Sequence, residues 1–151
     1  MAQAAVGKDP HLSLTKHNDL LYVPAQNSNT VTVLERETLA VVTDIAVMGA
    51  HGAGMRDDGA IFYTTNLPGG GVGGLVTIDT GSNSVLGTTD TPLAVPHNIA
   101  LTKKGEKLYV THSGATADQV SIYRASKQQP VPVLLSTVTV GLNPFGLAYV
   151  P

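Results

Sequence analysis

Five histidines are the residues of this chain whose type best suits chemistry, because neutral imidazole is a good ligand for zinc, copper or iron. They are His11, His17, His51, His97 and His112. His97 and His112 lie in the stretch "VPHNIALTKKGEKLYVTHSG" (95–114), on either side of a predicted pair of strands. Two histidines alone are common in proteins, so a site depends on the elements that position them.

A glycine-rich stretch, "PGGGVGGL" (68–75), contains Gly69, Gly71 and Gly74 in a G-x-G-x-x-G arrangement. Dinucleotide binding requires a helix directly after such a loop, so that the helix N-terminus receives the pyrophosphate. Here a strand pattern, "LVTID" (75–79), follows. The stretch is therefore interpreted as a flexible loop.

The acidic and hydroxyl side chains give no catalytic pattern. Asp57 and Asp58 fall in a predicted hairpin turn, where Asp is favoured whatever the function. Ser113 adjoins His112, but neighbours on a strand point to opposite sides, and no G-x-S-x-G elbow occurs. The chain has no cysteine, which excludes disulfides and thiolate metal sites.

Composition favours one all-β domain. The chain has 151 residues, of which 42% are hydrophobic and 13% charged, with 16 glycines and a net charge of -2. The charges form no basic cluster, so nucleic acid and acidic membrane surfaces are not expected partners. The start of the chain lacks the pattern of a signal peptide, and no run of eighteen apolar residues occurs, so no membrane insertion is expected.

An internal repeat organises the chain. The segments "LSLTKHNDLLYV" (12–23), "AGMRDDGAIFYT" (53–64) and "IALTKKGEKLYV" (99–110) align without a gap and share a tyrosine column. Its members are Tyr22, Tyr63 and Tyr109, spaced by 41 and 46 residues. This period lies in the range of a four-stranded propeller blade.

Each repeat continues with two further segments that predict strands by their alternating apolar and small polar residues. The segments are "TVTVL" (30–34), "LVTID" (75–79) and "QVSIY" (119–123), followed by "AVVTDIAV" (40–47), "SVLGTTDT" (84–91) and "PVLLSTVTV" (132–140). Asn18, Gly59 and Gly105 share the turn that precedes each tyrosine strand, where a tight hairpin needs positive φ. The pattern predicts a β-propeller of about three four-stranded antiparallel blades plus the first strand of a fourth. The blades span about 9–49, 50–94 and 95–142, and the fourth begins at about 143–151.

The stretches "GEKLYVTHSG", "GAIFYTTN" and "VGLNPFGLAYV" resemble the YVTN-type β-propeller repeat. The resemblance covers about residues 9–151 and implies the fold rather than one function. Relatives in this broad group include surface-layer and cell-surface proteins, haem-domain and quinoprotein relatives, lactonases, and the propeller domain of nitrous-oxide reductase. Because most of them are exported, a periplasmic or extracellular location is expected.

Such propellers usually have about six to eight blades, whereas this chain supplies three and a strand. An open ring exposes sheet edges and inner blade faces, which favour pairing with another chain. We therefore expect either a homo-oligomer that completes the ring or the remainder of a longer chain to cover these surfaces.

The repeat places the histidines. In this topology the first strand of each blade lines the central channel, and His51 in "GAHG" and His97 in "VPHN" share one column at its start. Phe145 fills that column in the last repeat and Pro10 in the first, with His11 one residue further along unless a gap is allowed. His112 begins the loop after its strand and is expected to lie on the same face.

Two functions from different classes follow. The favoured interpretation is a non-catalytic binding or scaffolding module that acts through its loop-bearing face. The alternative is a metal-binding or metal-dependent enzyme module, in which copper or zinc is held by His51, His97, His112 and His11. A lactonase-like hydrolase is less favoured, because no acidic cluster is evident at the starts of the blades. His17 is interpreted as a solvated turn residue.

Overall fold

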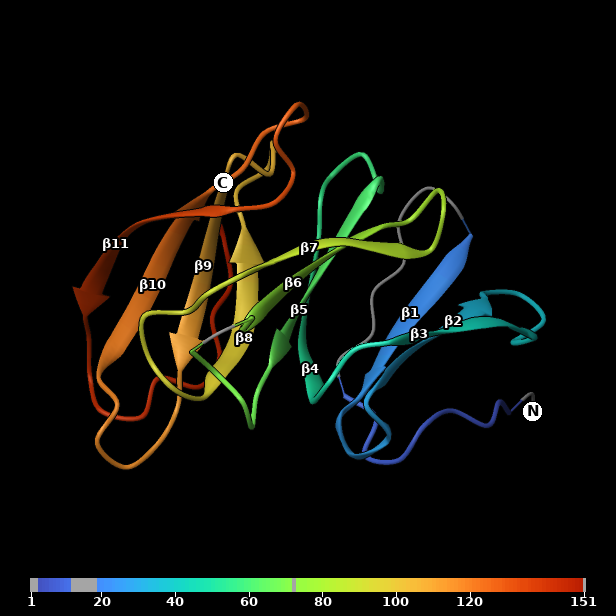
Figure 1. Ribbon diagram of the computed structural model, residues 1–151, viewed down its shortest axis with the longest axis horizontal. Coiled ribbons are helices and arrows are strands. Elements are labelled where there is room, and N and C mark those ends of the chain that lie inside the picture. Colours follow the sequence, from blue (N-terminus) through green and yellow to red (C-terminus); the bar gives the residue numbers. More distant parts are fainter. Residues whose placement is uncertain (1–2, 12–18, 72, 151) are drawn as a thin grey trace.

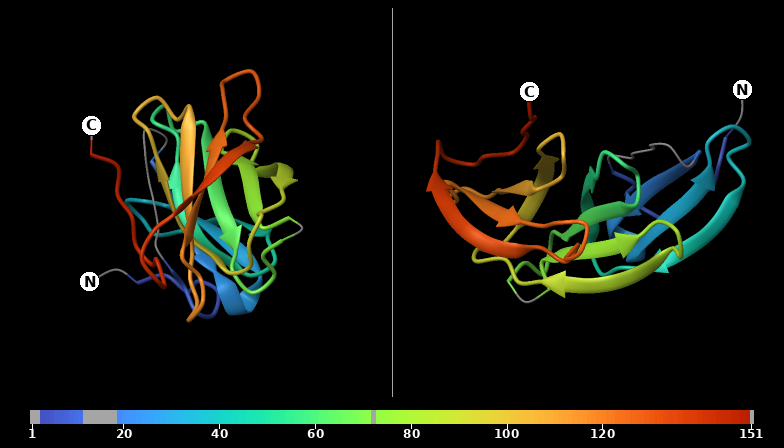
Figure 2. Two further views of the ribbon diagram at one scale, coloured as in Figure 1. Left: turned by 90° about the vertical axis from the view of Figure 1, so that its left-hand side faces the viewer. Right: turned by 90° about the horizontal axis from the view of Figure 1, so that it is seen from above.

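The computed structural model describes residues 3–11, 19–71 and 73–150, which form eleven strands and one short 3-10 helix. The strands make three antiparallel sheets that stand side by side along an arc (Figure 2). No described helix is long and apolar enough to cross a membrane. The prediction of an all-β propeller segment is therefore confirmed at the level of its sheets.

Within each sheet the strands follow one another in chain order (Figure 1). The first sheet contains β1 (Leu20–Ala25), β2 (Thr30–Glu35) and β3 (Val41–Ala46), with η1 (Gln26–Ser28) between β1 and β2. The second contains β4 (Ala50–Met55), β5 (Ile61–Asn66), β6 (Leu75–Asp79) and β7 (Ser84–Thr89). The third contains β8 (Pro96–Leu101), β9 (Lys107–His112), β10 (Gln119–Arg124) and β11 (Val133–Thr139).

Two ends of the predicted pattern differ from the rest. The strand expected over 12–17 in the first blade, together with His17 and Asn18, lies outside the described residues. At the other end, residues 142–150 form no strand, because no described strand follows to pair with them. The segment is held instead through the Phe145 carbonyl, which accepts hydrogen bonds from Asn98 Nδ2 and Thr111 Oγ1, each at 2.9 Å.

The core lies between neighbouring sheets. One cluster of buried side chains joins the first sheet to the second, and another joins the second to the third. The outermost strands β3, β7 and β11 are largely exposed and lie along the convex side of the arc (Figure 2). The inner strands β4 and β5 are buried at nearly every position, because both faces of the middle sheet are covered by its neighbours.

The tyrosine column links each blade to the next. Tyr22 Oη donates to Asn83 Oδ1 at 2.6 Å, which ties the first sheet to the β6–β7 turn. Tyr63 Oη donates to the Pro130 carbonyl at 3.0 Å, which ties the second sheet to the β10–β11 loop. Both rings are fully buried, whereas Tyr109 in the last blade is half-buried. The repeated tyrosine therefore marks a contact between blades.

Candidate functional site

In each repeat a residue with a left-handed backbone conformation lies shortly before the histidine, or before the phenylalanine that replaces it. Two residues before His11, His51, His97 and Phe145, the backbone φ is positive, between 52° and 58°. These residues are Asp9, Gly49, Val95 and Asn143. At His51 and His97 this turn leads into β4 and β8, and the four ring-bearing positions share the same backbone turn.

The four rings form one stack that crosses the blades. The ring centroids of His11 and His51 are 3.7 Å apart, those of His51 and His97 4.3 Å, and those of His97 and Phe145 4.0 Å. We call these residues the histidine column. The structure confirms that His51, His97 and Phe145 align, and it corrects the first repeat, where the member is His11 and not Pro10.

The one-residue shift has a visible cause. The His11 amide donates to the Pro24 carbonyl at 2.9 Å, and Pro10 pairs with Ala25, which fixes the segment beside β1. The Pro-His dipeptide at 10–11 matches Pro96–His97 and Pro144–Phe145 in sequence. This shared dipeptide indicates that His11 is equivalent to His97, which an alignment without gaps does not show.

Gly52 allows the strands that carry His51 and His97 to approach. A Cβ atom at Gly52 would lie 2.1 Å from the His97 carbonyl oxygen, which no side chain can tolerate. Thr65 completes the contact, since its hydroxyl donates to the His97 carbonyl at 2.9 Å and accepts from the Gly52 amide at 2.8 Å. The glycine of "GAHG" is therefore required for the spacing of the column.

His51 and His97 are joined directly through their ring nitrogens. The two Nε2 atoms are 3.0 Å apart, so one must carry a proton and the other must not. Asn98 Nδ2 donates to His97 Nδ1 at 2.9 Å, which leaves the His97 proton on Nε2. His51 then accepts at Nε2 and donates from Nδ1 to Gln26 Oε1 at 2.9 Å. The hydrogen bonds that link Gln26, His51, His97 and Asn98 are all satisfied when both imidazoles are neutral.

Burial keeps the pair uncharged. His51 and His97 are 7% and 6% exposed. Desolvation lowers the pKa of His51 to about 4, helped by the neighbouring His11 and His97 and opposed by Asp9. The pKa of His97 is lowered by the same burial and by His11. Both rings are therefore neutral at pH 7.

The column ends at a carboxylate. Asp9 Oδ2 lies 3.4 Å from His11 Nε2, and the His11 side chain is 26% exposed, which makes it the accessible end of the three histidines. Asp9 adopts a left-handed conformation, which is uncommon for a residue other than glycine. The buried, neutral pair His51 and His97 is thus followed in the stack by His11, which is partly exposed and lies beside Asp9.

In this arrangement the ring nitrogens of His51 and His97 are all used in hydrogen bonds, which compete with metal coordination. Coordination through His97 Nε2 would move its proton to Nδ1, which would then face the Asn98 amide donor. Asn98 cannot turn over without placing its oxygen against the Phe145 carbonyl. Among the described residues, no three His, Asp or Glu side chains are grouped to hold a metal. Copper or zinc binding by His11, His51, His97 and His112 stays an untested prediction.

His112 does not join the column. It is fully buried inside the third blade, where Nε2 lies 2.7 Å from Ser121 Oγ and Nδ1 lies 3.0 Å from the Ala94 carbonyl. Burial lowers its pKa, so the ring is neutral, with Nδ1 donating to Ala94 and Nε2 accepting from the serine. Both nitrogens are used within the blade, so this histidine supports the fold.

The remaining sequence candidates behave as turns and loops. The glycine-rich stretch connects β5 to β6, and its described residues form no helix. It is anchored by Asn66, whose Oδ1 accepts from the Gly69 amide at 3.1 Å. Asp58 lies in the β4–β5 turn and accepts from Arg56 Nε at 2.7 Å. Neither contributes to the histidine column.

Comparison with known proteins places this geometry in context. No protein-family model matches the chain, and no curated protein matches its sequence. A solved structure described as a putative 6-phosphogluconolactonase from Bacteroides fragilis superposes with a TM-score of 0.79 at 16% identity, over 92% of this chain and 41% of that one. The fold is a β-propeller.

Two further propeller structures agree. The periplasmic gluconolactonase of Pseudomonas aeruginosa gives a TM-score of 0.75 at 19% identity, over 91% of this chain and 41% of that one. Kuenenia stuttgartiensis hydrazine synthase gives 0.77 at 17% identity, over 95% of this chain and 40% of that one. The chain therefore spans about two fifths of the length of these proteins.

These comparisons correct the favoured functional interpretation. The expectation of a non-catalytic binding or scaffolding module is wrong on this finding, because structures that share the propeller carry the names of lactonases and of a synthase. The sequence makes a lactonase-like hydrolase less favoured, because no acidic cluster is evident at the starts of the blades. The structure does place one acid there, Asp9 beside His11, where a left-handed turn brings them together.

Proposed function

We propose that this chain is part of a propeller enzyme that hydrolyses a lactone or a similar cyclic ester. The observation that carries the proposal is the histidine column, whose accessible end is an imidazole 3.4 Å from the Asp9 carboxylate. The lactonase names of two structural neighbours support the same class. Their low identity makes this a proposal about chemistry rather than an inherited assignment.

The proposed step uses His11 as a general base. Asp9 favours the tautomer with the proton on Nε2, which leaves Nδ1 to take a proton from water. The resulting hydroxide attacks the lactone carbonyl, the ring carbon–oxygen bond breaks, and the imidazolium returns its proton to the alkoxide. The product is the open hydroxy acid, and the base is restored.

His51 and His97 act as positioning residues in this scheme. His51 stacks on His11 at 3.7 Å and is itself held by Gln26 and His97. Because these two rings are buried and neutral, they add no positive charge beside His11 before the reaction. They also leave His11 as the most exposed imidazole of the column.

We further propose that additional blades complete the ring, from a second copy or from the rest of a longer chain. The half-buried Tyr109 supports this, because its counterparts Tyr22 and Tyr63 are fully buried and each contacts the next blade. The segment "KLYVTH" supports assignment of the repeat to the YVTN type. The native mass of the chain distinguishes a dimer from a monomer.

Proton release tests the proposed activity. The purified chain is added to glucono-δ-lactone at pH 7 and the rate of acid formation is followed against the spontaneous rate. Acceleration that saturates with lactone supports the proposal. A rate equal to the spontaneous one, measured on a sample whose native mass shows a closed ring, contradicts it.

A further inference from the structure

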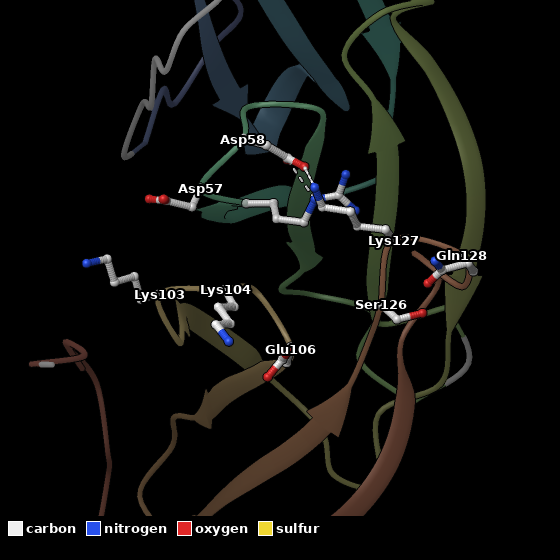
Figure 3. A pocket seen from close by; sticks show the side chains of 9 residues that line it. Asp57, Asp58, Lys103, Lys104, Glu106, Ser126, Lys127 and Gln128 are labelled. Atoms are coloured by element: carbon white, nitrogen blue, oxygen red, sulfur yellow. Dashed lines mark hydrogen bonds and ion pairs between the residues drawn. The ribbon is translucent and has the colours of Figure 1, made fainter.

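A polar cleft lies at the other end of the blades from the histidine column. His51 and His97 begin β4 and β8, whereas the cleft opens where these strands end, at Arg56 and Lys103. Its walls come from the β4–β5 turn, the β8–β9 turn and the β10–β11 loop, and its volume is about 660 Å³ (Figure 3). The proposed lactone chemistry makes no use of it.

The cleft is lined by four cations and three carboxylates, so its lining carries a formal charge of +1. Four of the nine Lys and Arg residues of the chain line it, although the chain as a whole carries a net charge of -2. They are Arg56, Lys103, Lys104 and Lys127. Figure 3 shows Lys103 and Lys104 on one side of the space and Asp58 with Lys127 on another. An anion in the cleft is thus approached by cations from three separate turns.

Arg56 is held in place with unused donors. It is 7% exposed, and toward the described residues its side chain donates only from Nε, to Asp58 Oδ1 at 2.7 Å. Nη1 is buried and has no acceptor among the described residues. A buried guanidinium donor without a partner is costly, and a phosphate oxygen is the acceptor that its planar shape fits best.

Two neighbours fix this arginine. The Arg56 hydrogen bond is the main cause that lowers the pKa of Asp58 to about 2, so the carboxylate is charged and anchors Nε across the physiological range. Gly105, with φ of +67°, lies against the Arg56 stem, because a Cβ there would be 2.6 Å from Arg56 Cγ. The arginine is therefore positioned before any ligand arrives.

We propose that this cleft binds the phosphate group of a small molecule. Arg56 supplies the fork of donors, and Lys103 and Lys104, both exposed, supply mobile charges on the facing turn. A doubly charged phosphate gains more from this set of cations than a carboxylate does. Glu106 and Gln128 line the remaining space and offer acceptors for hydroxyl groups of the same molecule.

The test is a titration with inorganic phosphate, followed by amide chemical shifts at constant ionic strength, with sulfate and acetate in parallel. Binding is expected to saturate, to shift amides at 56–60 and 102–106, and to be stronger for phosphate than for acetate. The double variant Lys103→Gln/Lys104→Gln should weaken it by about tenfold or more, because each charge-assisted contact is worth that order. Arg56→Gln should abolish it.

The matched control is Lys107→Gln/Arg124→Gln, which removes the same charge from exposed residues outside the cleft. It should bind phosphate as the unchanged chain does. If Arg56→Gln fails to fold, the Lys103→Gln/Lys104→Gln variant tests the proposal, because its substitutions are at exposed side chains and should leave the fold intact. Equal binding of acetate, no saturation, or equal weakening by the control pair would each overturn the proposal.

Discussion

His97 Nε2 and His51 Nε2 face each other at 3.0 Å, although the two residues are 46 positions apart and belong to different blades. One proton lies between them, and Asn98 and Gln26 determine on which ring it resides. Equivalent positions of successive repeats, His51 and His97, are therefore joined by hydrogen bonds that run from one sheet to the next. The chemistry of this pair depends on both rings being neutral.

Stability should fall as the pH is lowered from about 6.5 to 4. The folded pKa of His51, about 4, lies below its ordinary value of 6.5, so the unfolded chain binds this proton first. The contribution is complete above pH 6.5 and is lost as the pH approaches 4, by about 3 kcal/mol for His51 alone. Urea unfolding at pH 7.5, 6, 5 and 4 measures it.

The variant His51→Phe provides the control for this pH dependence. Phenylalanine already occupies the equivalent position at Phe145, so the stack is kept while the titrating group is removed. The loss of stability between pH 6.5 and 4 should become smaller, with His97 and His112 still contributing in the same direction. An unchanged pH profile would show that His51 is not a source of the effect.

Gly52→Ala should destabilise the protein by about 3 kcal/mol or more. The added methyl group meets the His97 carbonyl oxygen, which is backbone and cannot move aside without separating β4 from β8. Gly141→Ala is the matched control, because a Cβ there meets nothing within 4 Å. Equal free energies of unfolding for the two variants would contradict the close approach of the strands.

Val95→Asn should stabilise the protein by about 1 kcal/mol. Val95 has φ of +52°, which is strained for a β-branched side chain, and Asn143 adopts the same conformation at the equivalent position. Thermal unfolding gives the sign directly. A lower midpoint for the variant would mean that contacts of the valine side chain outweigh the backbone strain.

Tyr63→Phe should cost about 1 kcal/mol, because the hydroxyl donates to the Pro130 carbonyl of the next blade. Tyr109→Phe serves as the comparison, since the Tyr109 hydroxyl makes no hydrogen bond to a described residue. Its replacement should change the free energy of unfolding by less than about 0.5 kcal/mol. Similar losses for both variants would argue against the tyrosine column as a link between blades.

Much of the fold could be predicted because its signals are local. The alternation of "LVTID" and "QVSIY" requires strands, and the tyrosine spacing gives the period of the blades. The position of His11 could not be obtained in this way. It depends on the turn at Asp9 and on backbone hydrogen bonds to β1, which together absorb one residue.

The site was predictable only in part for a similar reason. The column of His51 and His97 follows from the repeat, but its protonation depends on Gln26 and Asn98, which no spacing indicates. His112 does lie at the end of the blade that carries His97, since it pairs with Pro96, but Ser121 on the adjacent strand holds its ring inside the blade. No sequence pattern singles out Arg56, because the walls of its cleft come from three separate turns.

The most direct test of the histidine column as a catalytic centre compares lactone hydrolysis by the unchanged chain, His11→Gln and His112→Gln at pH 7. Removal of the base should lower the enzymatic rate by about a hundredfold or more in His11→Gln. His112→Gln should lose stability but retain kcat when assayed well below its unfolding midpoint. Full activity of folded His11→Gln, or an equal loss in both variants, would contradict the account.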